Sequence, residues 1–303
     1  MAENISHINE SEALNTPSID SISNEPWVCL NGSWMRDSEA VIPVENRGMM
    51  YGDGLFETMV SIDGQVKLLD LHLKRLVRGL EYLGIDLKTS TEEWGAFFEA
   101  GINKNSHLGT KLLLRLQCWR KGGRGYTSKT SEGLWFLSFC TMPKEISQPS
   151  YRLMSSSLTL PHKSVQQSIL KSSNALLYVL AATEARNQNY NDALLCNTDG
   201  YVGECTSANI FWIKQRTIYT PSTKCDILKG TRREALLRAL QSQSYFRVQE
   251  GTYDIHSLYE ADMVFSTSTI KGIQPIDSLD TTQFSKDECA LNRIKKIYQS
   301  IIL

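Results

Sequence analysis

The chain has 303 residues, of which 41% are hydrophobic, and a formal net charge of −1. That length favours two hydrophobic cores over one, and the balanced charge excludes a global field that would recruit nucleic acid or an anionic membrane surface. No apolar run is long enough to cross a bilayer, so we expect neither a transmembrane helix nor a membrane partner.

The N-terminal segment, residues 1–26, is polar, slightly acidic and without an apolar core stretch. We therefore expect a disordered tail there rather than a secretory signal. The seven cysteines are scattered, and no C-x-x-C spacing occurs. This pattern indicates neither a zinc site nor a disulfide framework, and it favours a reducing cytoplasm as the location.

Turn residues and leucine spacing organise the first elements after the tail. Two hairpins are expected, turning at Asn31-Gly32 and at Asp63-Gly64. Leucines recurring at spacings of four and three then predict an amphipathic helix over 69–83. Asp70 is the expected N-cap of that helix, and Gly84 is its expected stop.

Further along, the pattern predicts one helix and two strands, at 91–103, 111–119 and 134–140. A segment with two prolines and little apolar matter, near 141–150, predicts a domain boundary. We therefore expect a small N-terminal α/β domain over 27–143 and a larger C-terminal domain over 150–303.

Strands and helices are mixed in the second half as well. Strands are expected near 151–158, 192–196, 209–214, 216–220 and 262–266, with helices over 172–187, over 231–242 and from about 284. The run from Ala175 to Ala185 is apolar nearly all round, so the first of these helices is expected to be buried. The predicted fold class is mixed α/β in two domains.

Lys171 stands immediately before this apolar helix. A lysine sheltered from water has a lowered pKa, because burial penalises the charged form. The neutral amine can then attack carbonyl groups and form Schiff bases. The alternative is a solvent-exposed lysine at a helix start, and this feature alone does not decide between the two.

Glu204 lies on an expected strand in GYVGECTSANIF, where apolar residues flank a small, hydroxyl-rich stretch. A glutamate in such surroundings needs a cationic or protonated partner. The alternative is an exposed glutamate on a strand.

Three further features suit an anion. Gly230-Thr231 precedes a helix, whose free N–H groups can bind phosphate, and the hydroxyl run from Ser266 to Thr269 ends an apolar strand before Gly272. His72 and Arg75 share one helix face at positions i and i+3. The alternatives are a helix cap, a solvated turn and a solvated charged face.

Together, a sheltered lysine, a buried acid and several phosphate donors describe pyridoxal 5′-phosphate. Its aldehyde needs a lysine, its pyridine nitrogen an acid and its phosphate a set of donors. A carboxylate about 4 Å from the ring nitrogen contributes roughly 4 kcal/mol at an effective dielectric near 20, enough to keep the ring protonated at neutral pH. Five histidines without paired spacing predict no metal site.

Six ordered motifs resemble those of the class IV aminotransferase family: NRGMMYGDGLFET, HLKRL, LKSSNALLYVLAATEA, GYVGECTSANIF, ILKGTRREAL and FSTSTIKGIQPI. The resemblance runs from about residue 27 to the C-terminus. It implies fold type IV of the pyridoxal-phosphate enzymes, as in D-amino-acid aminotransferase. The cofactor is then expected between a small and a larger domain, in a homodimer that acts on a small molecule.

The same resemblance implies roles for individual residues. Lys171 is the catalytic Schiff-base lysine, Glu204 meets the pyridine nitrogen and Leu228 supports the ring. The phosphate-binding set is Arg75, Gly230, Thr231, Ser268 and Thr269. One departure stands out, because the family often has Ile-Thr where this chain has Thr231-Arg232. A second hydroxyl is missing there, and whether Arg232 faces the anion stays open.

The loop CWRKGGRGYTS bears on the reaction. It is similar to the G-G-R-G-Y loop of the 4-amino-4-deoxychorismate lyases, which release pyruvate and leave 4-aminobenzoate, a folate precursor. We take Phe56, Arg120 and Arg124 as substrate-binding residues, with Arg124 able to pair a substrate carboxylate. A solvated, flexible loop is the alternative for Arg124.

We favour the prediction of a lyase over that of an aminotransferase. The alternative is a branched-chain or D-amino-acid aminotransferase that uses 2-oxoglutarate. A third reading is a non-catalytic homologue that binds the cofactor or a phosphorylated ligand, and the presence of both Lys171 and Glu204 argues against it.

Overall fold

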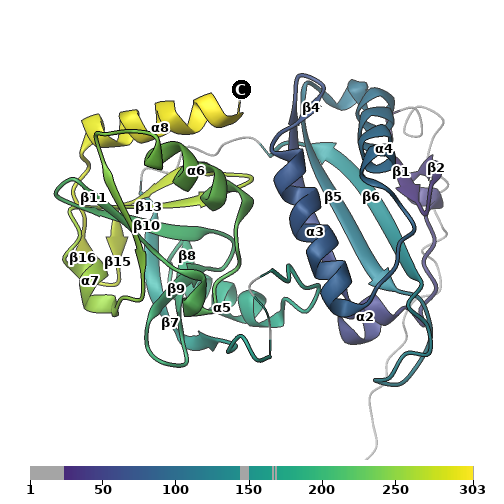
Figure 1. The fold of residues 1–303 in the computed structure, drawn as a ribbon, viewed down its shortest axis with the longest axis horizontal. Helices are drawn as coiled ribbons and strands as arrows, with labels where there is room; N and C mark the ends of the chain where they lie inside the picture. Colours follow the sequence, from purple (N-terminus) through teal and green to yellow (C-terminus); the bar gives the residue numbers. More distant parts are fainter. Residues whose placement is uncertain (1–23, 144–149, 166, 168, 303) are drawn as a thin grey trace, which may run out of the picture.

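The computed structural model describes residues 24–143, 150–165, 167 and 169–302. Most of the expected tail, residues 1–23, lies outside the described residues. Two sheets stand side by side and divide the molecule into two halves (Figure 1). The boundary expected near 141–150 falls between these sheets, and residues 144–149 are not described. The division into two folding domains stays a prediction.

The first half holds a sheet with six described strands, β2-β1-β6-β5-β3-β4 in spatial order, all paired antiparallel. Their bounds are β2 (Ser33–Arg36), β1 (Trp27–Leu30), β6 (Gly133–Thr141), β5 (Lys111–Arg120), β3 (Gly54–Ile62) and β4 (Gln65–Val66). Helices α3 (Leu69–Leu83) and α4 (Thr91–Lys104) cover one face of it, and the short α2 (Arg47–Tyr51) precedes β3 (Figure 1). The sequence prediction for these strands and both long helices is confirmed.

Both expected hairpin turns are confirmed. Asn31 and Gly32 have φ angles of 50° and 88°, and Asp63 and Gly64 have φ angles of 49° and 81°. Positive φ at both central residues matches the twist of the flanking strands, which is why Asn-Gly and Asp-Gly suit these positions.

The amphipathic helix is confirmed, but its expected N-cap is wrong. Leu73, Leu76 and Leu80 are buried in the core cluster of this half, as the leucine spacing predicts. Helix α3 begins at Leu69 after Leu68, which has a left-handed φ of 59° and makes no capping bond with its side chain. Asp70 lies inside the first turn, where its charge still favours the positive end of the helix dipole. Gly84, with φ 63°, ends the helix as expected.

The second half holds a larger sheet with ten described strands. Eight follow the order β12 (Arg247–Gly251), β11 (Thr217–Pro221), β10 (Asn209–Lys214), β9 (Val202–Cys205), β8 (Asp192–Asn197), β7 (Arg152–Leu160), β15 (Ser278–Leu279) and β16 (Thr282–Gln283). Off this path, β13 (Met263–Ser268) pairs with β10 and with β14 (Gly272–Ile276). Pairs β11–β12, β7–β8 and β7–β15 are parallel.

Among the described residues, four α-helices accompany this sheet: α5 (Leu176–Asn187), α6 (Thr231–Gln241), α7 (Ile255–Tyr259) and α8 (Glu288–Ile302). Helices α6 and α8 share one core cluster with β10 and β13, built around Phe211, Leu236, Phe265 and Ile294. No helix in the described ranges is both long and apolar enough to span a membrane.

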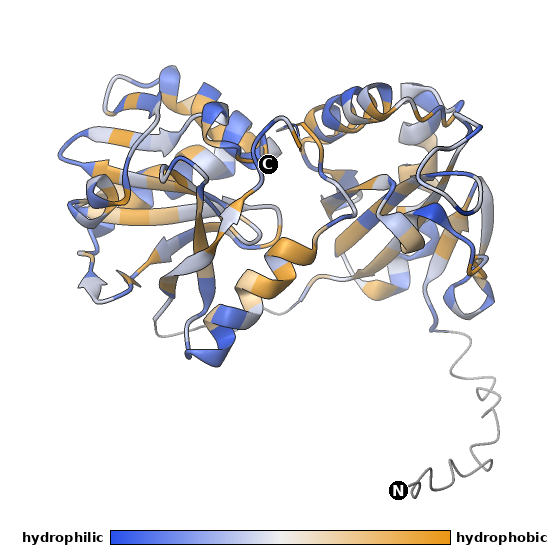
Figure 2. Cartoon of the chain, turned by 90° about the horizontal axis from the view of Figure 1, so that it is seen from below, coloured by the Kyte–Doolittle hydropathy of each residue, from blue (hydrophilic) through white to orange (hydrophobic). Residues whose placement is uncertain are grey.

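Helix α5 differs from its prediction in two ways. Residues before it are extended rather than helical, because the Phe56 N–H donates to the Lys171 carbonyl (2.9 Å) and Ser173 N–H donates to the Gly54 carbonyl (2.9 Å). The expectation that the helix is buried is wrong for the single chain. Leu176, Val179 and Leu180 are 64%, 58% and 49% exposed. Figure 2, which views the molecule from below, shows α5 on the near side with its first turns coloured hydrophobic.

Candidate active site

A cavity of about 380 Å³ lies where the two halves meet. Strands β3 and β5, helix α3, the segment before α5, strands β9 and β10, the start of α6 and the β13–β14 turn all contribute to its wall. Among its lining residues are Phe56, Thr58, Arg75, Arg115, Lys171, Tyr178, Glu204, Leu228, Gly230, Thr231, Ser268 and Thr269. The structure therefore brings together the lysine, the acid and the phosphate-donor residues that the sequence singles out.

Lys171 is held by the edge of β3 and is sheltered from water. The pKa of its amine is lowered from 10.5 to about 8, because burial and the nearby Arg75 guanidinium disfavour the charged form more than Glu57 and Glu204 favour it. The ammonium nitrogen lies 4.5 Å from the centre of the Phe56 ring. Near neutral pH a useful fraction of this amine is therefore unprotonated and nucleophilic.

Glu204 is the third of the four residues of strand β9 and is only 4% exposed. Its Oε2 accepts from the Leu228 N–H (3.0 Å) and from Asn209 Nδ2 (2.9 Å), while Oε1 accepts from the Tyr178 hydroxyl (2.9 Å). Burial raises the pKa of Glu204 to about 7, although these bonds lower it in part. A buried carboxylate held in this way is poised to meet a positive charge in the cavity.

Arg75 belongs to a buried network that the sequence did not predict. Its Nε and Nη2 donate to the two oxygens of Glu57 (2.7 and 2.6 Å), and its Nη1 donates to the Lys229 carbonyl (3.0 Å). His72 Nδ1 lies 2.7 Å from Glu57 Oε2, and its Nε2 lies 3.3 Å from the Thr231 hydroxyl. His72 and Glu57 are almost completely buried, so this helix face is not solvated.

Charge within this network follows from burial and pairing. Burial lowers the pKa of His72, so the imidazole is neutral and donates from Nδ1 to Glu57. Arg75 and His72 together hold the pKa of Glu57 low against the cost of burying its charge. The signal that could have found Glu57 is its place in β3, where an acid interrupts a largely buried strand.

Helix α6 begins at Gly230-Thr231, which we call the phosphate-donor turn. No side chain caps the first N–H groups of this helix. Its N-cap is Gly230, where a Cβ would lie 2.0 Å from Asn209 Oδ1. Only glycine therefore fits between the helix start and the residue that holds Glu204. Such a helix start binds anions through its N–H groups and its dipole.

A family model described as amino-transferase class IV matches residues 54–279. The chain belongs to the class IV aminotransferase family.

Relatives of this family carry more than one activity in their names. A Methanocaldococcus jannaschii protein, provisionally named a branched-chain-amino-acid aminotransferase, is 30% identical over 255 residues, covering 84% of this chain and 88% of that protein. The aminodeoxychorismate lyase of Bacillus subtilis is 27% identical over 280 residues, covering 91% and 94%. The branched-chain aminotransferase of Thermoproteus uzoniensis, solved with norvaline, superposes with a TM-score of 0.84 at 23% identity, covering 91% and 93%.

As a class IV aminotransferase the chain uses pyridoxal 5′-phosphate, and the cavity fits this cofactor. The donor set has an amine at Lys171, an acid at Glu204 and, for the phosphate, the Arg75 guanidinium and the start of α6, with the hydroxyls of Ser268 and Thr269 in the same wall. When bound, the cofactor supplies an aldehyde that condenses with amines and a protonated ring that withdraws electrons from a substrate carbon.

Arg232, where the chain departs from the family pattern, is buried beside the cavity. The residue contributes to the cavity wall, but its side chain is 3% exposed and bonds to Tyr298 of α8. Within the described residues its Nε and Nη1 have no hydrogen-bond partner, and both atoms are buried. The guanidinium is therefore buried between the cavity wall and Tyr298 of the second half's core.

Arg115 is a cavity residue that sequence reasoning missed. Its guanidinium carbon lies 4.0 Å from the centre of the Phe56 ring. No ion pair to Arg115 is found within the described ranges, so its charge is available to a ligand. The available signal was an arginine in the middle of the largely apolar run LLLRLQCW.

Arg120 and Arg124, the two arginines predicted to bind substrate, lie outside the wall of the cavity around Lys171. Arg120 pairs with Asp53 (3.1 Å) and donates to the Gly84 carbonyl (2.8 Å). Arg124 is 80% exposed at its side chain and pairs with Glu45 at 3.1 Å. Neither arginine contributes to the wall of the cavity around Lys171, and their substrate-binding role stays a prediction.

Proposed function

We propose that this class IV enzyme is a 4-amino-4-deoxychorismate lyase that supplies 4-aminobenzoate for folate precursor synthesis in the cytoplasm. The observation that carries the proposal is that one cavity holds the Lys171 amine, Glu204 and the Arg115 guanidinium, which has no ion pair in the described chain. The loop RKGGRGYTS and the similarity to the B. subtilis lyase over 91% of this chain support the lyase over a transferase.

In this proposal each cavity residue has a separate task. Arg75, Gly230, Thr231, Ser268 and Thr269 hold the cofactor phosphate, Leu228 supports the ring, and Glu204 keeps the ring nitrogen protonated. Arg115 pairs with a substrate carboxylate, and Phe56 packs against the substrate.

Lys171 Nζ is the proposed group that moves protons. Elimination of pyruvate from 4-amino-4-deoxychorismate leaves 4-aminobenzoate and needs no second substrate. The ring carbon gives up a proton in this reaction, and the departing pyruvate gains one. An amine with a pKa of about 8 can take up and return a proton near neutral pH.

A paired assay on one cofactor-loaded preparation tests this function. We expect equal amounts of pyruvate and 4-aminobenzoate from 4-amino-4-deoxychorismate, and no amino transfer from leucine or D-alanine to 2-oxoglutarate. Lys171→Ala should abolish turnover. Lys163→Ala, which removes an exposed lysine eight residues upstream, is the matched control and should retain it.

A branched-chain aminotransferase is the second candidate, and the M. jannaschii relative at 30% identity favours it. Amino transfer to 2-oxoglutarate without pyruvate release would overturn the lyase and establish this function. If neither product forms although the cofactor is bound at Lys171, both proposals fail and a non-catalytic homologue is left.

We also propose that the enzyme is a homodimer that uses the open face of α5. Leu176, Val179 and Leu180 form a contiguous apolar stripe at spacings of three and four, and each is about half exposed or more. Contiguous exposed apolar surface of this kind marks interaction sites. Ala175 and Tyr178, at the start of the same helix, belong to the cavity wall, so a partner seated here would border the active site.

A further inference from the structure

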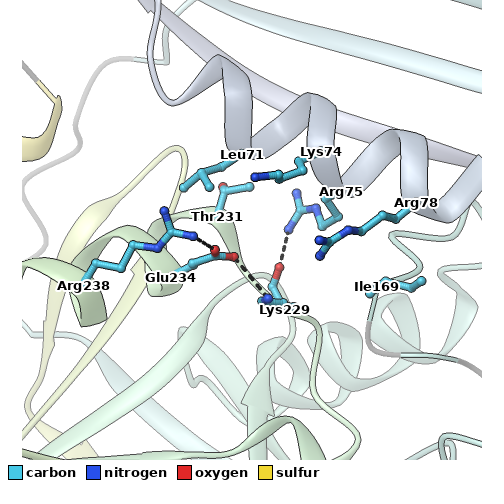
Figure 3. A pocket seen from close by; sticks show the side chains of 9 residues that line it. All are labelled: Leu71, Lys74, Arg75, Arg78, Ile169, Lys229, Thr231, Glu234 and Arg238. Carbon is cyan, nitrogen blue, oxygen red and sulfur yellow. Dashed lines mark hydrogen bonds and ion pairs between the residues drawn. The ribbon is translucent and has the colours of Figure 1, made fainter. Parts of the chain in front are cut away.

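A second cavity, of about 150 Å³, borders the active-site cavity and shares Arg75 and Thr231 with its wall (Figure 3). We call it the outer pocket. It sits between helix α3 of the first half and the start of helix α6 of the second half. Lys74, Arg75 and Arg78 reach into it from α3, while Lys229, Glu234 and Arg238 come from the opposite side.

The outer pocket is strongly basic. Five cationic side chains surround one carboxylate, that of Glu234. Glu234 is already shared, because it pairs with Lys229 (3.6 Å) and with Arg238. Lys74 and Arg78 have no ion pair within the described parts of the chain. Arg75 is paired with Glu57, so the uncompensated positive charge of the cluster rests on Lys74 and Arg78.

The backbone adds to this charge. Helix α6 has 11 residues, and its N-cap makes no side-chain bond, so the positive end of its dipole faces the same region. The α3 cations and the α6 start face each other across the pocket (Figure 3). The volume suits a compact anion and excludes an extended polyanion such as a nucleic acid strand.

We propose that the outer pocket binds a phosphate-sized dianion, either inorganic phosphate or the phosphoryl group of a phosphorylated metabolite. Lys74 and Arg78 are its distinguishing donors, because they belong to this cavity and not to the wall around Lys171. Donors from both halves would close on one anion, so binding stabilises the arrangement in which α3 lies against α6. The site does not depend on which reaction the enzyme performs.

Calorimetric titration of the cofactor-loaded enzyme tests the outer pocket. The cofactor's own phosphate then occupies the inner site, and added inorganic phosphate at constant ionic strength reports on the outer one. We expect saturable binding of one phosphate per chain and a higher unfolding temperature in phosphate. Acetate, a monoanion, should bind much more weakly.

A matched pair of variants identifies the donors. Lys74→Ala/Arg78→Ala should weaken phosphate binding by about tenfold or more, because charge-assisted hydrogen bonds are lost. Both side chains are exposed, and the unfolding temperature without phosphate checks that the variant is folded. Arg247→Ala/Lys296→Ala removes the same charge from exposed positions of the second half and should bind phosphate as the parent does.

Glycerol 3-phosphate separates the two sources of the anion. Tighter binding than inorganic phosphate indicates a phosphorylated metabolite, and equal or weaker binding indicates phosphate itself. The proposal is overturned if phosphate binds only to cofactor-free protein, since the anion would then occupy the cofactor site. Equal loss of binding in both double variants would also overturn it, because a general charge effect would explain the result.

Discussion

At the scale of single residues, the active site depends on charges that only burial and pairing make useful. Lys171 is partly neutral because its burial and the nearby Arg75 lower its pKa. Burial shifts the pKa of Glu204 in the opposite direction, upward, and so favours its neutral, protonated form. Arg75 is fixed by Glu57 and by the Lys229 carbonyl, 154 residues away in the chain. The cofactor thus meets groups that are already oriented.

Glu204 should make the cofactor-free protein less stable as pH rises. Its pKa in the folded protein is about 7, above the ordinary value of 4.5, so the folded state binds more protons between these values and stability falls with pH. A neutral amide lacks this loss. Unfolding free energies measured at pH 5 to 8 should therefore show Glu204→Gln gaining on the parent by about 2.5 kcal/mol across the window. Glu81→Gln, at an exposed glutamate, should show no such gain.

Arg75 should have two separable roles, in stability and in cofactor binding. Arg75→Met leaves the Glu57 carboxylate buried without its guanidinium, which should cost about 3 to 5 kcal/mol of unfolding free energy. Arg75→Met/Glu57→Gln should recover most of that stability, because the buried charge is gone. It should not recover pyridoxal-phosphate affinity, measured by absorbance titration of the cofactor-free protein. Recovery of both would contradict a phosphate-binding role for Arg75.

At the scale of elements, short irregular segments place the chemistry. The extended stretch before α5 ties Lys171 to β3 of the other half. Asn209 connects Glu204 to the segment that leads into α6. Its Nδ2 donates to Glu204 Oε2 (2.9 Å) and to the Leu228 carbonyl (3.0 Å). The acid and the anion site are therefore coupled by one side chain.

Gly230→Ala tests this coupling. The added Cβ would meet Asn209 Oδ1 at 2.0 Å, so Asn209 must move and its bond to Glu204 must weaken. We expect a loss of about 1 to 3 kcal/mol in unfolding free energy together with weaker cofactor binding. Gly95→Ala in α4, where a Cβ would meet nothing within 4 Å, should be neutral or stabilising by about 0.5 to 1 kcal/mol. Unchanged cofactor affinity in Gly230→Ala would refute the coupling.

At the scale of the whole molecule, the active-site cavity lies between the two halves, and each half supplies part of its wall. Arg75, Phe56 and Arg115 come from the first half, whereas Glu204 and Thr231 come from the second. The outer pocket also lies between the two halves. The exposed apolar face of α5 begins beside the active-site cavity. A partner chain bound to that face would therefore border the active site.

Val179→Glu should separate the proposed homodimer. A buried, unpaired charge in an apolar contact is costly, so the variant should elute as a 34.2 kDa chain, while the parent elutes at twice that mass. Light scattering after size-exclusion chromatography measures both. Gln299→Glu on α8, an exposed polar position, makes the same charge change and should leave the dimer intact. A monomeric parent protein would contradict the proposal.

Much of the fold is readable from local patterns. The hairpin turns at Asn31-Gly32 and Asp63-Gly64 and the leucine face of α3 follow from φ preferences and helical periodicity, and both are confirmed. Leu68 replaced Asp70 as the cap of α3, because the entry of the chain from β4 sets where that helix begins. Strand β12, which has little buried surface, gave no clear pattern, because its place depends on pairing with β11.

The sequence by itself determined the family and its cofactor and predicted the residues that bear the chemistry, since Lys171, Glu204 and Thr231 stand in motifs whose composition is tied to one cofactor. Only the tertiary structure decided that Glu57 and His72 fix Arg75, that Arg115 faces the cavity, that the Arg232 guanidinium is buried and that Arg120 lies outside the cavity wall. It also decided that α5 keeps an open apolar face. The physical reason is that each of these outcomes depends on burial and charge partners supplied by distant segments, which a local pattern does not contain.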